Sequence, residues 1–199
     1  MCGIVAILNA AKDPMDTRKL ILEMSKRIRH RGPDWSGLWT DGTNFLCHER
    51  LAIVDPDSGS QPIKDDTGKV ILTVNGEIYN HANLKDGLKH KNVKITNNDC
   101  EAILHAWMEN GEDVCSMLDG IFAFVLLDTR TEPVTFIAAR DPLGVIPMYY
   151  GYRTDGSIMF ASEMKCLVDE CTRFTIFPPG HLLTSSDHSV QPRPREGSC

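Results

Sequence analysis

Residues 1–8, MCGIVAIL, place a cysteine and a glycine directly in front of an apolar run, Ile4–Leu8. Branched apolar side chains without a polar interruption predict a strand that is buried on both faces. Chain ends are usually loose, but a strand this close to the first residue would hold the end of the chain inside a sheet. We therefore expect Cys2 to have a fixed position at the edge of the core.

Two helices are expected downstream of this strand. Asp16 can cap the first helix, which ends near Gly32. Asn98 or Asp99 can cap the second helix, which Gly111 stops. Each helix carries apolar residues at helical spacing on one side, so each is expected to pack on a sheet.

Eight further segments are expected to form strands, because they combine branched or aromatic residues with turn signals at their ends. Strands follow one another with helices grouped between them, and the order does not alternate strand with helix. This order predicts an α+β domain of stacked layers. The strand candidates are 36–40, 44–49, 51–55, 70–74, 120–128, 134–140, 147–151 and 157–161.

Length and charge narrow the classes of function. A chain of 199 residues with 42% hydrophobic and 24% charged residues is ordinary for one globular domain. The formal net charge of -6 argues against a nucleic-acid partner, which would select a basic surface. The longest apolar run, Ile121–Leu127, is too short to span a bilayer, and no basic lead precedes Ile4–Leu8 to make a secretory signal. We expect a cytoplasmic protein without a membrane partner.

The cysteines and histidines do not form a disulfide framework or a metal motif. Seven cysteines are an odd number, and no C-x-x-C pair occurs among them. Most lie in apolar segments, which indicates reduced and buried thiols. The seven histidines show no H-E-x-x-H motif and no spacing that joins them to cysteines. We therefore expect no metal site and no cofactor in this domain.

Cys2 can combine two chemical roles once Met1 is removed, as is usual when the second residue is small. The free α-amine has a pKa of about 8 and a free thiol about 8.5, so the amine can accept the proton of the sulfur. One residue then supplies both nucleophile and base. Gly3 permits close backbone approach beside it. A single cysteine at position 2 can also be incidental, and this alternative stays open on the residue alone.

Asn75 and Gly76 follow a predicted strand and suit the stabilisation of an oxyanion. A thiolate that attacks an amide carbonyl needs hydrogen-bond donors at the oxygen that becomes negative. The Asn75 side-chain amide and the Gly76 backbone N–H can provide them. The alternative is a hairpin turn, since Asn-Gly is a strong two-residue turn signal.

Three charged residues complete a set for a small amino acid. Arg50, at the edge of a predicted strand, can bind a carboxylate with two hydrogen bonds. Asp99 and Glu77 can accept from an ammonium group. Each could instead be a surface charge, and Asp99 could be only a helix cap. Together with Cys2 and Asn75 they suit an amino acid that carries a side-chain amide.

An ordered series of motifs resembles the class II glutamine amidotransferase domain, an N-terminal-nucleophile hydrolase. It is most similar to the N-terminal glutaminase domain of glutamine-hydrolysing asparagine synthetases. The resemblance covers residues 2–181. The series is Cys2, RHRGPD at 29–34, HERLAIVD at 48–55, SQP at 60–62, VNGEIYN at 74–80, DCE at 99–101, GIFAF at 120–124, RDPLGVIPMYYG at 140–151 and SEMK at 162–165.

The resemblance implies a fold and a reaction. The fold is a four-layer α-β-β-α sandwich in which two stacked antiparallel sheets lie between helix layers. In the reaction Cys2 attacks the carboxamide of L-glutamine and releases ammonia. Water then cleaves the thioester to glutamate. The implied function is to supply ammonia for asparagine synthesis from aspartate by an ATP-dependent synthetase domain.

The resemblance also assigns roles to residues. Cys2, Asn75 and Gly76 are the implied catalytic residues, and Asn75 and Gly76 also bind the substrate. Arg50 binds the carboxylate of glutamine, and Glu77 and Asp99 bind its ammonium group. The backbone of Leu51, Ala52, Ile53 and Val54 is expected close to the substrate.

Other polar residues of the motifs are expected to be structural. We expect Arg31 and Asp34 to hold the loop at Gly32 by charge pairing. The α-amine already fills the role of the base, so His30, His48 and His81 are expected to make structural hydrogen bonds. Asp141 and Glu163 are likewise expected to be structural partners.

The amidotransferase domain is expected to end at residue 181. Residues 182–199 form a polar segment with several prolines, which we expect to be a disordered tail or linker. Nothing in this chain resembles the pyrophosphate loop of a synthetase domain, so ATP and magnesium are expected only for a synthetase domain absent from this chain. The expected partners are L-glutamine and an ammonia-accepting domain, and analogy with the family allows a homodimer.

The sequence leaves three alternatives open. The domain could belong to another class II enzyme, of the purine, hexosamine or glutamate synthesis type. It could be a glutamine-binding regulatory module with little turnover. A cysteine-rich redox protein is a third alternative, which predicts a labile thiol other than Cys2.

Overall fold

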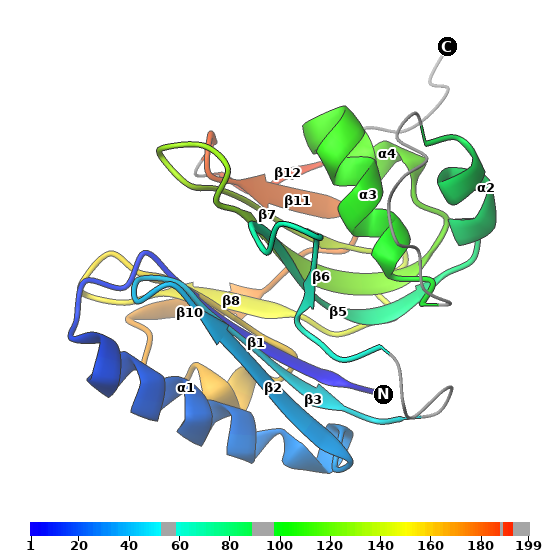
Figure 1. The fold of residues 1–199 in the computed structure, drawn as a ribbon. Helices are drawn as coiled ribbons and strands as arrows, with labels where there is room; N and C mark the ends of the chain where they lie inside the picture. Colours follow the sequence, from blue (N-terminus) through cyan, green and yellow to red (C-terminus); the bar gives the residue numbers. More distant parts are fainter. Residues whose placement is uncertain (53–58, 89–97, 188, 193–199) are drawn as a thin grey trace.

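The structure is a computed structural model that describes residues 1–52, 59–88, 98–187 and 189–192. Two six-stranded antiparallel sheets lie face to face, and helices cover their outer sides (Figure 1). This is the expected α-β-β-α order of layers. Of the described helices, none has the length and apolar character that a bilayer crossing requires.

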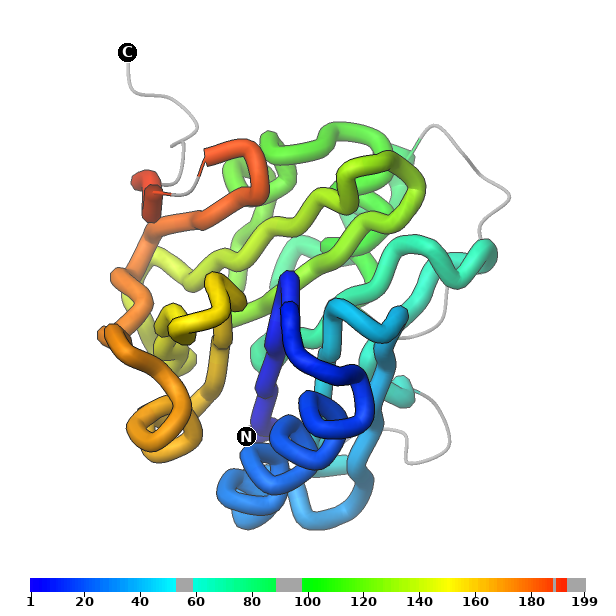
Figure 2. The backbone as a smooth tube through the Cα atoms, turned by 90° about the vertical axis from the view of Figure 1, so that its left-hand side faces the viewer, coloured from blue at the N-terminus to red at the C-terminus, as the bar shows by residue number. Residues whose placement is uncertain are grey.

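The first sheet has the N-terminal strand near its middle. Helix α1 (Pro14–Arg27) covers its outer face. Figure 2 shows the blue N-terminal strand between its yellow and cyan neighbours. The order is β10 (Arg173–Ile176), β8 (Tyr149–Tyr152), β9 (Ile158–Ala161), β1 (Gly3–Leu8), β3 (Phe45–Arg50) and β2 (Trp35–Thr40).

The second sheet lies under the remaining α-helices, α2 (His81–Asp86), α3 (Glu101–Asn110) and α4 (Val114–Met117). Short 3-10 turns occur at Arg29–Arg31, Gly111–Asp113 and Met164–Cys166. The sheet order is β12 (Gln191–Pro192), β11 (His181–Thr184), β7 (Thr135–Arg140), β6 (Gly120–Asp128), β5 (Val70–Ile78) and β4 (Ile63–Lys64).

Strand periodicity explains how the core is divided between layers. In β1, Ile4 and Ala6 pack between the sheets, whereas Val5 packs under α1. In β6, Val125 packs between the sheets, whereas Phe124 packs under α3. Successive side chains of a strand point to opposite faces, so a fully apolar strand serves two cores. Each of the larger buried side chains, such as Ile4 and Phe124, contributes about 1.5–3 kcal/mol. The prediction of a doubly buried first strand is confirmed.

The first helix begins earlier than expected. Asp13 accepts hydrogen bonds from the backbone N–H groups of Met15 and Asp16 at 2.8 and 3.3 Å. Pro14 stands at the first helical position, where its missing N–H is not needed. The cap predicted at Asp16 is therefore wrong by one turn. The predicted stop of the second helix at Gly111 is confirmed by a positive φ of 57°.

Strand β5 does not stop at Asn75, contrary to the prediction. It continues to Ile78, and Asn75 and Gly76 pair with Ala123 and Phe122 of β6. A Cβ on Gly76 would lie 2.1 Å from the Ile121 carbonyl oxygen, and its φ is 151°. Glycine therefore allows β6 to come close to the strand, and the alternative of a hairpin turn is wrong.

The expected tail from residue 182 also begins too early. Leu182 and Leu183 belong to β11 and are buried against β7, with Leu183 only 1% exposed. Strand β12 adds a further edge up to Pro192. A run of only two apolar residues is too short to show the alternation that predicts a strand. Residues 193–199 lie outside the described part of the chain.

Five other elements, α2, α4, β4, β10 and β12, were not predicted. Each has at most six residues, and their sequences carry weak periodicity. The expected strand at 51–55 is wrong where it can be compared, since Leu51 and Ala52 have no strand conformation. Its last three residues lie outside the described ranges.

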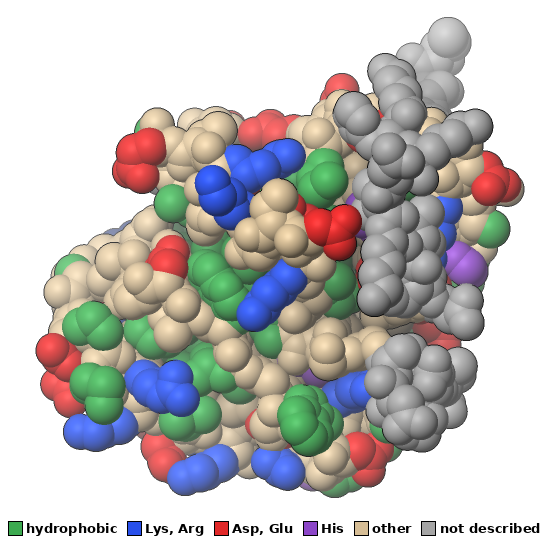
Figure 3. Space-filling model, viewed as in Figure 1, with side chains coloured by type: hydrophobic (Ala, Val, Ile, Leu, Met, Phe, Trp, Pro, Cys, Tyr) green, Lys and Arg blue, Asp and Glu red, His purple; other side chains and the backbone are tan. Residues whose placement is uncertain are grey.

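On the face of the molecule shown in Figure 3, basic, acidic and apolar side chains are mixed.

His48 is a buried imidazole between the two sheets, and its Nδ1 lies 3.3 Å from the Thr73 hydroxyl of β5. Burial and then the charge of Arg50 lower the pKa of His48 to about 3. The unfolded chain binds a proton below about pH 6.5, whereas the folded chain does not until about pH 3. Stability is therefore lost as the pH falls through this window.

We predict that His48→Gln weakens the acid sensitivity of folding. The loss of unfolding free energy between pH 7 and pH 5 is expected to be smaller in the variant by about 2 kcal/mol. Urea unfolding at both pH values measures it. His181→Gln, at the end of β11, is the control and should keep the wild-type loss. An equal loss in wild type and His48→Gln would contradict a neutral buried imidazole.

Candidate active site

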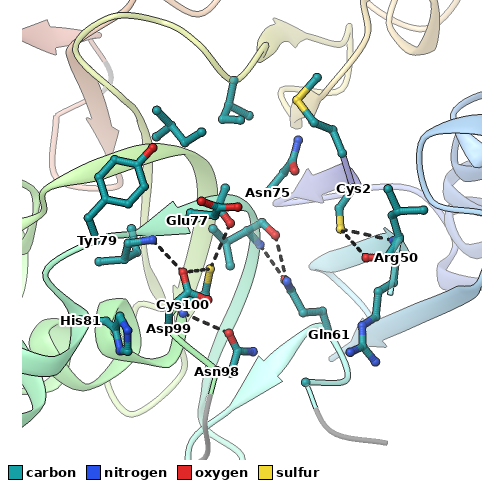
Figure 4. Close-up of a pocket in the computed structure, with 18 residues that line it drawn as sticks. Cys2, Arg50, Gln61, Asn75, Glu77, Tyr79, His81, Asn98, Asp99 and Cys100 are labelled. Atoms are coloured by element: carbon teal, nitrogen blue, oxygen red, sulfur yellow. Dashed lines mark hydrogen bonds between the residues drawn. The ribbon is translucent and has the colours of Figure 1, made fainter. Parts of the chain in front are cut away.

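A cavity of about 600 Å³ opens between the ends of β1 and β5, one strand from each sheet (Figure 4). Its size suits a small polar ligand. It brings together seven of the predicted site residues, which are separated by up to 97 positions in the sequence: Cys2, Arg50, Leu51, Asn75, Gly76, Glu77 and Asp99. Ala52 is described but does not line it, and Ile53 and Val54 lie outside the described residues.

The Cys2 sulfur lies at the cavity wall and is held by the segment after β3. The backbone N–H of Leu51 donates to Sγ at 3.4 Å, and Sγ lies 3.9 Å from the Leu51 carbonyl oxygen. The side chain is partly exposed, so a ligand in the cavity can reach the sulfur. The expectation that β1 fixes the position of Cys2 agrees with this geometry.

A cluster of charged residues anchors the backbone of Cys2 from the other side. Arg31 Nε donates to the Cys2 carbonyl at 3.0 Å, and its Nη1 lies 3.3 Å from Glu163. Glu163 also contacts His30 at 2.8 Å and Lys165 at 2.9 Å. Burial would raise the pKa of Glu163, but the hydrogen bonds from Lys165, Arg31 and His30 outweigh it and lower the pKa.

Arg31 and Asp34 hold neighbouring segments, although no ion pair joins the two within the described chain. Asp34 accepts from the Ala52 N–H at 2.8 Å, and its own N–H donates to the Arg50 carbonyl at 3.1 Å. The predicted charge pairing about Gly32 is therefore wrong. A carboxylate at position 34 instead positions the segment that contacts the Cys2 sulfur.

Asn75 presents an unused hydrogen-bond donor to the cavity. Its side chain is 3% exposed, and Nδ2 has no hydrogen-bond partner among the residues that the structure describes. A buried amide left without a partner costs about 1–3 kcal/mol. Such groups are rare and need an explanation, and a ligand oxygen at the cavity wall would satisfy this one. Figure 4 shows the amide on the same side of the cavity as Cys2.

Charged groups of opposite sign line different parts of the cavity. Figure 4 shows Arg50 on one side and the carboxylates of Glu77 and Asp99 on the other. Asp99 Oδ2 accepts from the Ile78 N–H at 2.7 Å, which ties the segment before α3 to β5. Asp99 is not the helix cap, because α3 is preceded by Cys100 and lacks a side-chain cap. The cavity can therefore hold a zwitterion.

Burial suppresses the ionisation of four other cysteines. Burial raises the pKa of Cys47, Cys166 and Cys171 to about 11. Burial, followed by the Asp99 charge, also raises the pKa of Cys100, which lines the cavity. A protonated thiol is a poor nucleophile, so burial disfavours each of these four cysteines as the nucleophile.

Several cavity residues were missed by the sequence reasoning. Gln61, Tyr79, His81 and Asn98 line the wall together with the predicted set. His81 Nδ1 is buried without a hydrogen-bond partner in the described ranges, so this nitrogen does not make the structural hydrogen bond expected of His81. Gln61 and Tyr79 belong to motifs that were identified, but nothing in their type or spacing distinguished them from loop residues.

Comparison with known proteins gives the family. A family model described as glutamine amidotransferase domain matches residues 1–194. Asparagine synthetase [glutamine-hydrolyzing] 3 of Arabidopsis thaliana is 53% identical over 191 residues, which are 96% of this chain and 32% of that protein. Asparagine synthetase [glutamine-hydrolyzing] 2 of Oryza sativa subsp. japonica is 54% identical over 185 residues, 93% of this chain and 31% of that protein. The chain thus spans about a third of these relatives.

Solved structures give the fold. Glutamine phosphoribosylpyrophosphate amidotransferase from B. subtilis matches with a TM-score of 0.72 at 20% identity, over 96% of this chain and 48% of that one. A glutamine aminotransferase class-II domain protein from Silicibacter pomeroyi matches with a TM-score of 0.57 at 14% identity. The match covers 97% of this chain and 100% of that one. The expected N-terminal-nucleophile hydrolase fold is confirmed. With a family match over almost its whole length, this chain belongs to the glutamine amidotransferase domain family, in its class II form.

Proposed function

We propose that this chain hydrolyses the side-chain amide of L-glutamine through a thioester on Cys2. One observation carries the proposal: the Cys2 sulfur and the Asn75 Nδ2 donor, which lacks a partner among the described residues, line a single cavity. Arg50 on one side and Glu77 with Asp99 on the other side match the two charged ends of an amino acid. A nucleophile, an oxyanion donor and a zwitterion site then serve one substrate.

Removal of Met1 is part of this proposal. Met1 is 58% exposed, so an aminopeptidase can reach it, and its side chain lines the cavity. Its removal enlarges the space beside the sulfur and leaves the α-amine of Cys2 free. The amine can then take the thiol proton at neutral pH.

The steps follow from the positions of the groups. The sulfur attacks the carboxamide carbon, and the carbonyl oxygen becomes negative next to the Asn75 amide and Gly76. The ammonium of Cys2 returns the proton to the leaving nitrogen, the carbon–nitrogen bond breaks, and ammonia departs. A water molecule, deprotonated by the same amine, then attacks the thioester carbon. The products are glutamate and the free thiol.

The ammonia acceptor is proposed from the relatives. The two relatives described above are named asparagine synthetases, and this chain corresponds to about a third of each. We therefore propose an ammonia-accepting synthetase domain as the partner, which makes asparagine from aspartate with ATP and magnesium. The amidotransferase chemistry described here needs neither, because Cys2 supplies nucleophile and base.

Product analysis tests the hydrolysis. Chain with Cys2 as its first residue, verified by mass spectrometry, should convert L-glutamine to equal amounts of glutamate and ammonia. Hydroxylamine should divert the thioester to γ-glutamyl hydroxamate. Saturable glutamine binding without either product would support the regulatory module instead. Full activity in chain that retains Met1 would contradict the role of the α-amine.

We predict that Arg50→Lys raises the KM for glutamine about 10- to 100-fold, since a bidentate charged contact contributes about 1.5–3 kcal/mol. The kcat should change less than threefold, because the carboxylate of glutamine takes no part in the reaction. Steady-state kinetics measures both constants. Arg173→Lys on β10 is the control and should leave them unchanged. A loss confined to kcat would contradict this role.

A further inference from the structure

Gln61 occupies a strand position through its side chain. Ile63 and Lys64 of β4 pair with Leu72 and Ile71, so position 61 stands opposite Val74 in the same register. There the Gln61 side chain makes the two hydrogen bonds that the backbone of a residue in a neighbouring strand would make. Nε2 donates to the Val74 carbonyl at 2.9 Å, and Oε1 accepts from the Val74 N–H at 2.8 Å. The amide thus replaces a peptide unit at the edge of β5.

The backbone of Gln61 touches the other sheet. A Cβ on Gly37 of β2 would lie 1.8 Å from the Gln61 carbonyl oxygen. Only glycine, which has no Cβ, therefore fits at position 37. Gln61 therefore stands between β2 of the first sheet and β5 of the second, at the wall of the cavity. The two sheets supply the sulfur and the oxyanion donor, so the spacing between them determines the active geometry.

Gln61 holds the backbone of Val74, and Asn75 is the next residue in the chain. Asn75 provides the donor that lacks a partner among the described residues, and its direction depends on the backbone from which it starts. A displacement of about 1 Å in a reacting geometry can cost about 100-fold in rate. The same loop also reaches the Arg50 side of the cavity, because a Cβ on Gly59 would lie 3.3 Å from Arg50 Nη2.

We propose that Gln61 is a positioning residue for catalysis: its side-chain amide holds the Val74 peptide and thereby aims the Asn75 donor at the carbonyl oxygen of the substrate. The inference rests on the proposed glutaminase function. It assigns Gln61 no contact with the reacting atoms, since one donor and one acceptor of its amide already bind Val74.

Gln61→Glu tests this role with a change of almost no volume. The ionised carboxylate of this variant cannot donate to the Val74 carbonyl and repels it. The protonated carboxyl group has an O–H donor and a C=O acceptor in the places of the amide groups. At pH 8 we expect kcat to fall about 10- to 100-fold, with less than a threefold change in KM. As the pH falls towards 5.5 and the carboxyl group begins to protonate, the ratio of variant to wild-type kcat should rise.

Controls separate positioning from general damage. Gln191→Glu makes the same substitution on β12, away from the cavity, and its kcat ratio to wild type should stay constant with pH. The melting temperature of Gln61→Glu is measured at both pH values. A pH-independent kcat ratio for Gln61→Glu overturns the inference, as does unchanged kcat at pH 8.

Amide hydrogen exchange gives a readout that does not depend on turnover. Relative to wild type at each pH, the Val74 and Asn75 amides of Gln61→Glu should exchange at least tenfold faster at pH 8, and this difference should narrow as the pH falls to 5.5. Unchanged exchange at these amides overturns the inference. An inactive wild-type chain would refute the proposed function, and this exchange measurement would still decide whether Gln61 holds the segment.

Discussion

Cys2→Ala is expected to reduce glutaminase activity by about 10⁴-fold or more, because the variant lacks the atom that forms the thioester. Cys2→Ser should be much slower than wild type, since a hydroxyl is far less acidic and less nucleophilic than a thiol at neutral pH. Glutamate production from saturating L-glutamine, followed over hours, measures both variants. Binding should survive, because Arg50, Glu77 and Asp99 are unchanged. Calorimetric titration of Cys2→Ala is therefore expected to give a Kd for glutamine close to the KM of the wild type.

Cys171→Ala is the matched control for this loss. Cys171 is also a free and partly exposed thiol, but burial raises its pKa to about 11, and its sulfur contacts Met159 at 3.5 Å. Its removal should leave kcat and KM unchanged. If Cys2→Ala kept substantial activity, or if Cys171→Ala abolished it, the nucleophile would be another group and the proposed mechanism would be wrong.

Asn75→Ala is expected to lower kcat about 10²- to 10³-fold with less than a threefold change in KM. The donor acts on an oxygen that is more negative in the transition state than in the bound substrate, so its loss appears in kcat. Asn75→Asp should be at least as slow, because a carboxylate would face the developing oxyanion. Steady-state kinetics with L-glutamine tests both variants.

Stability gives a second, independent signature at this position. Nδ2 of Asn75 has no protein partner within the described ranges, so its removal breaks no hydrogen bond of that atom. We expect the melting temperature of Asn75→Ala to stay equal or to rise. Asn80 is the contrasting control, because its side chain donates to the Met117 carbonyl at 2.8 Å and accepts from the Asp119 N–H at 3.0 Å.

Asn80→Ala should therefore lose about 1–2 kcal/mol of stability and keep its kcat. The opposite pattern, a destabilised Asn75→Ala with normal kcat, would show that Asn75 is structural. Melting temperatures and kinetics on the same four preparations, including wild type and Asn75→Asp, distinguish the two cases.

Elements with strong local patterns were predictable. Ile4–Leu8 and 120–128 are apolar at almost every position. In a segment this short, such a pattern indicates a strand that is buried on both faces. Both are central strands of their sheets. The stop of α3 at Gly111 was equally local, because a positive φ after a helix selects glycine.

Elements that depend on distant partners were not predictable. Asn75-Gly76 has the composition of a turn, yet it lies inside β5 because β6 packs where a Cβ would stand. Leu182 and Leu183 form a strand because β7 offers them a buried edge. The pairing of Gln61 with Val74 joins residues 13 positions apart through a side chain, and no period in the sequence marks it.

The sequence by itself determined the layered α+β class and the chemical types available for the site: a thiol near the first residue, an amide, a guanidinium and two carboxylates. These follow from residue identity and short-range patterns, which are local properties of the chain. Only the tertiary structure decided that these groups meet at one cavity, that the Asn75 donor is left without a partner in the described part of the chain, and that Asp99 binds β5 and does not cap a helix. Such facts depend on which segments pack together, and that packing is set by the burial of both sheets at once and not by any single stretch of residues.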